Sequence, residues 1–123
     1  KLDKKFLDEL IKIIELNVNT EKLDMPFIAA QMHMSHSTLY RKIKGLLGIS
    51  GTEFIRRIRL RYSLRLMLEE GYNISEAAYA AGFSDVGYFR NCFKGEYGMT
   101  PSEYMKQQKS SISVKYNMGE NDE

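Results

Sequence analysis

The stretch GFSDVGYFRNCFKGEYGMTPSEY at residues 82–104 decides the fold, because a variant of it stands earlier in the chain. Residues 33–54 read HMSHSTLYRKIKGLLGISGTEF. A shift of 50 aligns the lysines, glycines and glutamates of the two copies: Lys44, Gly48 and Glu53 with Lys94, Gly98 and Glu103. Before Ser35 the best shift is 49, so the second copy has one residue more in its turn. Each copy reads as a short helix, a turn and a longer helix, which is the layout of a helix-turn-helix.

The rest of the chain also favours helices. Only two prolines and nine glycines occur in 123 residues, and apolar residues recur mainly at intervals of three and four. We therefore predict an all-α domain over residues 1–108, which opens with an amphipathic helix. The predicted parts that follow are a first helix-turn-helix at 25–48, a linker helix at 52–70, a second helix-turn-helix at 75–98 and a last helix at 101–108. Ser75 is the predicted cap of the second motif's short helix. Residues 109–123 lack any apolar period and are expected to be disordered.

Basic residues concentrate between the two copies. Eight basic residues and one acidic residue lie between Arg41 and Arg65, while the remainder has ten basic and 15 acidic residues. Such a stripe is typical of a surface that contacts phosphates, although a solvated helix face would look the same. We expect some of these arginines to contact phosphate and others to pair with acids such as Glu69 and Glu70.

The longer helix of each copy has an outward face suited to base recognition. Four apolar side chains are expected to point inward in the first copy: Leu39, Ile43, Leu46 and Leu47. Their helical spacing turns four polar side chains outward: Ser37, Tyr40, Arg41 and Lys44. The shift of 50 carries these positions to Gly87, Arg90, Asn91 and Lys94. Arginine can form two hydrogen bonds with one guanine, and asparagine can form two with one adenine. Lysine commonly contacts phosphate. An ordinary polar surface is the alternative, but matching positions in two repeats favour recognition of double-stranded DNA.

The linker helix has a suitable length for this task. About 19 residues at about 1.5 Å each give a rod of roughly 28 Å, against about 34 Å for one turn of B-DNA. One chain could therefore place two recognition helices in successive major grooves. Because the two outward faces differ, we expect an asymmetric, non-palindromic site.

Other functions have little support in the sequence. His33 and His36 lie three apart without a third metal ligand nearby, and the single cysteine, Cys92, falls among inward aromatic residues. No glycine-rich phosphate loop, paired carboxylates, long apolar run or leader stands out. We expect no enzymatic activity, cofactor, metal or membrane contact in this chain, and a cytoplasmic location. Because the chain starts at Lys1, we expect a piece of a longer polypeptide, although removal of an initiator or tag would give the same start.

These residues resemble the DNA-binding domain of the AraC/XylS-type bacterial transcription regulators over about 26–105. The second copy carries the family pattern as Gly82-Phe83-Ser84-Asp85, Tyr88-Phe89, Phe93-Lys94, Gly98 and Thr100-Pro101-Ser102-Glu103-Tyr104. The first copy carries Ile28-Ala29, Ser35, Leu39, Arg41, Lys44, Phe54-Ile55-Arg56 and Arg59-Leu60. The N-terminal segment and the sequence of residues 39–44 look most like the output domain of hybrid two-component regulators.

The resemblance implies a seven-helix, two-lobed fold whose third and sixth helices enter adjacent major grooves, with transcription, usually its activation, as output. It implies base reading by Ser37, Tyr40 and Arg41 in the first motif and by Val86, Gly87, Arg90 and Asn91 in the second. Phosphate contacts are expected from Ser35, Lys44, Arg56, Arg59 and Lys94. The implied partners are RNA polymerase and covalently linked sensor or receiver modules, with a histidine kinase in the parent polypeptide. Three positions depart from the family's usual residues: His33, Ser63 and Ala77.

A second class of function stays open at this stage. The basic helix could instead bind an acidic protein partner, such as a receiver domain or a polymerase subunit. The chain would then be a helical protein-interaction module.

Overall fold

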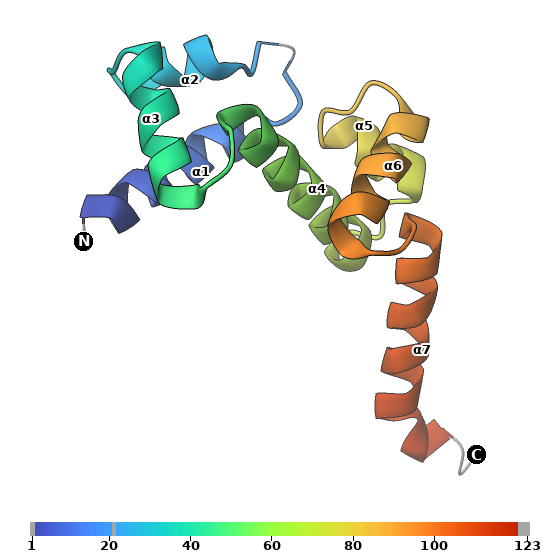
Figure 1. Ribbon diagram of the computed structural model, residues 1–123. Coiled ribbons are helices and arrows are strands. Elements are labelled where there is room, and N and C mark those ends of the chain that lie inside the picture. Colours follow the sequence, from blue (N-terminus) through green and yellow to red (C-terminus); the bar gives the residue numbers. More distant parts are fainter. Residues whose placement is uncertain (1, 21, 121–123) are drawn as a thin grey trace.

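The computed structural model describes residues 2–20 and 22–120, and it confirms the all-α prediction for them. They form seven helices, in this order: α1 (Leu2–Leu16), α2 (Met25–Gln31), α3 (His36–Leu47), α4 (Gly51–Glu69), α5 (Ile74–Ala80), α6 (Val86–Tyr97) and α7 (Pro101–Glu120). In Figure 1, α1–α3 gather at one end of α4 and α5–α6 at the other, while α7 extends away from the second group. The fold is therefore two lobes joined by α4.

The sequence repeat reappears as matching helix starts and stops. The N-cap side chains of Ser35 and Asp85 accept hydrogen bonds from the backbone N–H groups of Thr38 and Tyr88, at the starts of α3 and α6. Both helices end at a left-handed glycine, Gly48 with φ 73° and Gly98 with φ 78°. Glycine adopts this conformation without steric cost, so both longer helices stop after the same number of residues.

Four local predictions differ from the structure. Asn73, rather than Ser75, caps α5 and forms a capping box with Glu76, because an amide accepts from the N3 backbone as well as a hydroxyl does. The last helix does not end near residue 108, since α7 continues to Glu120. The predicted disordered tail is thus helical over 109–120, and 121–123 lie outside the described residues. Leu46 is 38% exposed instead of inward: it lies in the last turn of α3, where the neighbouring Leu47 packs against the first core.

Two hydrophobic cores divide α4 between them. The first core contains Ile55 and Ile58 from α4 together with residues of α1, α2 and α3. The second contains Leu60, Leu66 and Met67 from α4 together with residues of α5, α6 and the turn between them. The boundary between the two cores thus falls at position 59 of the chain.

Two of the departures from the usual family residues fit the second core. The fully buried hydroxyl of Ser63 donates a 2.6 Å hydrogen bond to the carbonyl oxygen of Leu60 in the preceding turn of α4. Its polar atom therefore has a partner inside the apolar surroundings. Ala77 is 0% exposed on α5, which contacts α4. A small residue at this position lets the two helices approach closely.

The third departure, His33, has a left-handed backbone in the turn between α2 and α3, with φ 57°. The matching residue of the second motif is Gly82, with φ 95°. This conformation costs a residue with a Cβ about 1 to 2 kcal/mol, and glycine avoids that cost. Glycine also loses more conformational entropy on folding, which offsets part of the gain. We expect His33→Gly to raise the free energy of unfolding by about 0.5 to 1 kcal/mol, measured by urea denaturation. His33→Ala retains a Cβ and should change stability little. Equal stabilisation by both variants would contradict the conformational explanation.

Candidate nucleic-acid interface

The recognition helices present the outward faces that the repeat predicted. On α3, Leu39 and Ile43 are 0% and 1% exposed, and on α6 both Phe89 and Phe93 are 0% exposed. The opposite faces are exposed: Ser37, Tyr40, Arg41 and Lys44 on α3, and Gly87, Arg90, Asn91 and Lys94 on α6. Val86 differs, since it is half-buried and packs against the second core. The structure thus leaves two polar, partly basic helix faces open to a partner.

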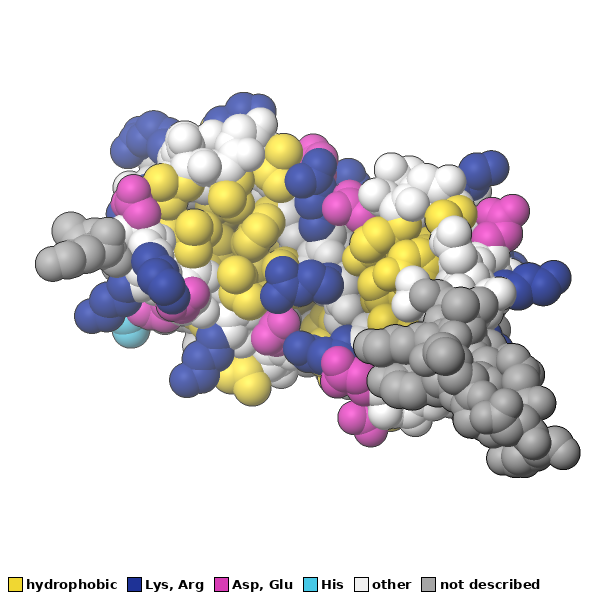
Figure 2. Space-filling model, turned by 90° about the horizontal axis from the view of Figure 1, so that it is seen from below, with side chains coloured by type: hydrophobic (Ala, Val, Ile, Leu, Met, Phe, Trp, Pro, Cys, Tyr) yellow, Lys and Arg dark blue, Asp and Glu magenta, His cyan; other side chains and the backbone are white. Residues whose placement is uncertain are grey.

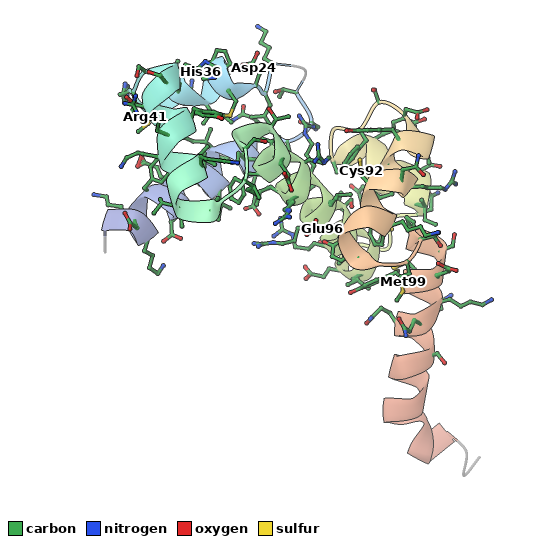
Figure 3. All side chains as sticks on the ribbon, in the orientation of Figure 1. Asp24, His36, Arg41, Cys92, Glu96 and Met99 are labelled. Carbon is green, nitrogen blue, oxygen red and sulfur yellow. The ribbon has the colours of Figure 1, made fainter. Side chains whose placement is uncertain are left out.

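The two faces are held in comparable orientations. In Figure 1 both α3 and α6 run from the top of the view to the bottom, so their N-terminal ends lie on the same side of the molecule. Figure 3 places Arg41 on the side of α3 away from α4, whereas Cys92 and Glu96 lie on the side of α6 toward α4. The N-terminal halves of both helices carry the predicted base-reading residues.

The opposite side of the molecule has a different character. Figure 2, seen from below, shows two apolar areas separated by basic and acidic side chains. A surface that neutralises a run of phosphates needs a basic excess, and on this face acidic side chains stand among the basic ones. The side with the helix N-termini carries the predicted base-reading residues and is the better candidate for a nucleic-acid interface.

The candidate phosphate-binding residues occupy different environments. Lys44 and Lys94 are exposed in the last turns of α3 and α6. Arg56 is half-buried and lines a groove between α4 and α6. Ser35 is exposed, but its hydroxyl already accepts from the Thr38 backbone at 3.1 Å and donates to the Thr38 hydroxyl at 2.8 Å. Of these four side chains, the two lysines are the most accessible to a phosphate.

Arg59 is directed at backbone carbonyls of both lobes. Its Nη1 donates hydrogen bonds to the backbone carbonyl oxygens of Val18, at 2.5 Å, and Ala81, at 3.2 Å. Burial lowers the pKa of this guanidinium from its ordinary value. The side chain points between the lobes because position 59 falls between the two apolar stripes of α4. These hydrogen bonds give Arg59 a structural role, and its phosphate contact stays a prediction.

Two further arginines of α4 form ion pairs, but not with the predicted acids. Arg57 pairs with Glu53 at 3.1 Å and with Glu96 of α6 at 3.3 Å, and Arg65 approaches Glu15 of α1 to 3.9 Å. Among the described residues no pair with Glu69 or Glu70 forms; the partners are Glu53 one turn earlier on α4, and Glu96 and Glu15 on α6 and α1. These side chains are 29 to 46% exposed, so each pair adds little to stability.

Residues 2–20 and 22–120 lack two further features, a metal-binding cluster and a membrane-spanning helix. Their His, Cys, Asp and Glu side chains do not gather in groups of three or more that could hold a metal ion. None of the helices there combines the length and apolar character needed to cross a membrane.

Comparisons with known proteins agree with this architecture. A family model described as a helix-turn-helix domain matches residues 28–107. The chain is 33% identical over 106 residues to histidine kinase P4 of Formosa agariphila. The aligned residues make up 86% of this chain and 8% of that kinase. The chain spans less than half the length of the first curated relatives it matches.

Solved structures with the same fold are also similar in sequence. A Chromobacterium violaceum transcriptional regulator described as containing an AraC-type DNA-binding domain superposes with a TM-score of 0.77, at 26% identity, over 85% of this chain and 92% of that one. The C-terminal domain of the two-component response regulator yesN from Fusobacterium nucleatum gives 0.66 at 28% identity, over 80% and 96% of the two chains. Together with the family match over more than half of the chain, these findings confirm the resemblance stated from the sequence: this protein belongs to the helix-turn-helix domain family and is an AraC-type DNA-binding domain.

Proposed function

We propose that this domain regulates transcription by binding one asymmetric DNA site with both helix-turn-helix motifs, α3 and α6 lying in successive major grooves. The observation that carries the proposal is that two exposed polar helix faces stand at the two ends of one continuous 19-residue helix. At about 1.5 Å per residue α4 is roughly 28 Å long, close to the pitch of B-DNA, which is about 34 Å. The chain thus has the geometry that single-motif proteins obtain by forming dimers.

The residues of each face have distinct proposed roles. In α3, Arg41 reads guanine, and Ser37 and Tyr40 add polar contacts. In α6, Arg90 and Asn91 suit guanine and adenine, while Gly87 allows the backbone to approach the bases. Half-buried Val86 can offer only part of its surface, which suits contact with a thymine methyl group. Ser35, Lys44, Arg56 and Lys94 are proposed phosphate contacts.

The place of this domain in a larger protein is part of the same proposal. Its similarity to a histidine kinase and to the C-terminal domain of a response regulator supports an output role at the end of a sensor polypeptide in the cytoplasm. Phosphoryl signalling would then reach DNA through covalently linked receiver modules. Activation through contact with RNA polymerase is the proposed output.

Selection of bound duplexes from a random pool tests the DNA proposal directly. We expect the selected sites to be bipartite and non-palindromic, with half-sites about 10 base pairs apart. Two identical inverted half-sites would instead indicate a dimer that uses one motif of each copy.

The salt dependence of binding provides a second prediction. If four to six phosphates are neutralised, the logarithm of the association constant should fall with that of the salt concentration with a slope of about −4 to −5. Replacing exposed Lys44 or Lys94 with alanine should make this slope shallower by about 1. Titrations by fluorescence anisotropy at several salt concentrations measure both values. Affinity that does not change with salt would contradict DNA binding and favour a protein partner for the basic helix.

A further inference from the structure

One side chain joins the two lobes directly. Val18 follows α1 and belongs to the first lobe, whereas Ala81 ends α5 and belongs to the turn of the second helix-turn-helix. The Nη1 atom of Arg59 donates to the backbone carbonyl oxygens of both residues. A single guanidinium on α4 thus holds segments that are 63 residues apart in the sequence.

Gly82 leaves the space that this guanidinium occupies. A Cβ on Gly82 would overlap the Arg59 guanidinium and the Val18 carbonyl oxygen. The glycine at this turn therefore has two functions: it adopts φ 95°, and it lets the arginine lie against the backbone. We refer to Arg59, Gly82 and the carbonyls of Val18 and Ala81 as the interlobe clamp.

The other links across the middle of the molecule are weaker. The Arg57–Glu96 and Arg65–Glu15 ion pairs have partly exposed partners and are screened by salt. The two hydrophobic cores occupy separate halves of α4, with the boundary at position 59. Apolar packing therefore fixes each lobe on α4 separately, and the interlobe clamp is the sheltered polar contact between them.

The clamp also reaches the second recognition helix. Backbone N–H groups of Gly82 and Phe83 donate to the carbonyls of Tyr79 and Ala78, so the turn that carries Gly82 is tied to α5. Phe83 packs edge-on against Phe89 of α6, with ring centroids 5.1 Å apart. Holding this turn in place consequently holds α6 in place relative to the first lobe.

We propose that the interlobe clamp fixes the angle and distance between α3 and α6 and thereby determines which spacing of DNA half-sites the domain accepts. Arg59 is in this sense a positioning residue, since it acts on DNA through the placement of α6. The proposal rests on the proposed binding of two successive major grooves.

A series of duplexes with altered spacing tests the proposal. Each base pair inserted between the half-sites moves one of them by about 3.4 Å and rotates it by about 34° around the DNA axis. The wild-type domain should lose affinity about tenfold or more on insertion of one base pair, whereas Arg59→Met should lose less than about threefold. Arg61→Met is the matched control, because it removes one positive charge from an exposed position of the same helix and should keep the wild-type spacing profile. An unchanged profile in Arg59→Met would overturn the proposal.

A measurement without DNA separates the clamp from the DNA-binding proposal. Spin labels on cysteines introduced at exposed Gln31 of α2 and Tyr79 of α5, in a Cys92→Ser background, report the distance between the lobes by pulsed electron paramagnetic resonance. We expect a narrow distribution for the parent protein and a broad one for Arg59→Met. Arg59→Lys keeps the positive charge but replaces the planar guanidinium with a compact ammonium, which cannot reach both carbonyls in the same geometry. It should broaden the distribution partly, and it provides the test if the methionine variant does not fold.

The two measurements have distinct outcomes. An equally narrow distribution in the Arg59 variants would overturn the clamp. A parent protein with a narrow distance distribution that binds all spacings equally would instead overturn the two-groove function, and with it the role of the clamp in spacing.

Discussion

Gly82→Ala is expected to lower the free energy of unfolding by about 3 to 5 kcal/mol, the largest effect that the structure predicts for one methyl group. The added Cβ would overlap the Arg59 guanidinium and the Val18 carbonyl oxygen, so one of them must move. Displacing Arg59 leaves two sheltered carbonyls without their side-chain donor. The residue must also keep φ 95°, which side chains adopt only with strain. Urea denaturation followed by circular dichroism measures the loss.

Gly98→Ala is the matched control. Gly98 has φ 78° at the end of α6, but a Cβ there would meet nothing within 4 Å. It therefore carries only the conformational cost, about 1 kcal/mol. If both alanine variants lost the same stability, the close contact between Gly82 and Arg59 would not contribute, and the turn would need glycine for its backbone alone.

The sequence repeat predicted the fold well because the residues that start, end and orient each helix lie within or next to that helix. A capping side chain before α3 and α6, a left-handed glycine after each, and inward residues four apart are sufficient to place both helices and their outward faces. Such signals depend on neighbours within one or two helical turns. For that reason the positions of Arg41 and Arg90 on exposed faces could be read from the chain alone.

Contacts between distant segments could not be read in this way. Nothing near Arg59 in the sequence indicates that its guanidinium meets carbonyls of Val18 and Ala81, so it was assigned to phosphate with the other arginines. The residues that pair with Arg57 and Arg65 depend in the same way on how α1 and α6 pack against α4. Gly82 carried the one available signal, since a glycine where the first motif has His33 indicates a close approach as well as a turn.

Replacing Arg41 with alanine is expected to weaken binding to the selected DNA site by about 1 to 3 kcal/mol, which is roughly a 5- to 150-fold loss of affinity. The exposed guanidinium of Arg41 can form two hydrogen bonds with one guanine, and random DNA offers that base only by chance. The loss on random duplexes should therefore be smaller. Competition binding with both duplexes measures the two values, and equal losses would reassign Arg41 to phosphate contact.

Lys42 provides the control for charge on the same helix. Its ammonium lies 4.8 Å from the ring centroid of Phe6 in α1, so the side chain is directed toward the first core and away from the proposed base-reading face. Lys42→Ala removes the same unit of charge. It should weaken binding to the selected and the random duplex equally, by less than about 1 kcal/mol.

Arg90→Ala completes the test, because it changes the other recognition helix. If α3 and α6 read different half-sites, repeating the selection with Arg41→Ala should relax base preference in one half-site only, and with Arg90→Ala in the other only. The spacing of the half-sites should stay unchanged in both variants, since neither residue takes part in the interlobe clamp. Loss of preference in the same half-site for both variants would mean that one motif alone reads the DNA, and that the second lobe contributes only affinity.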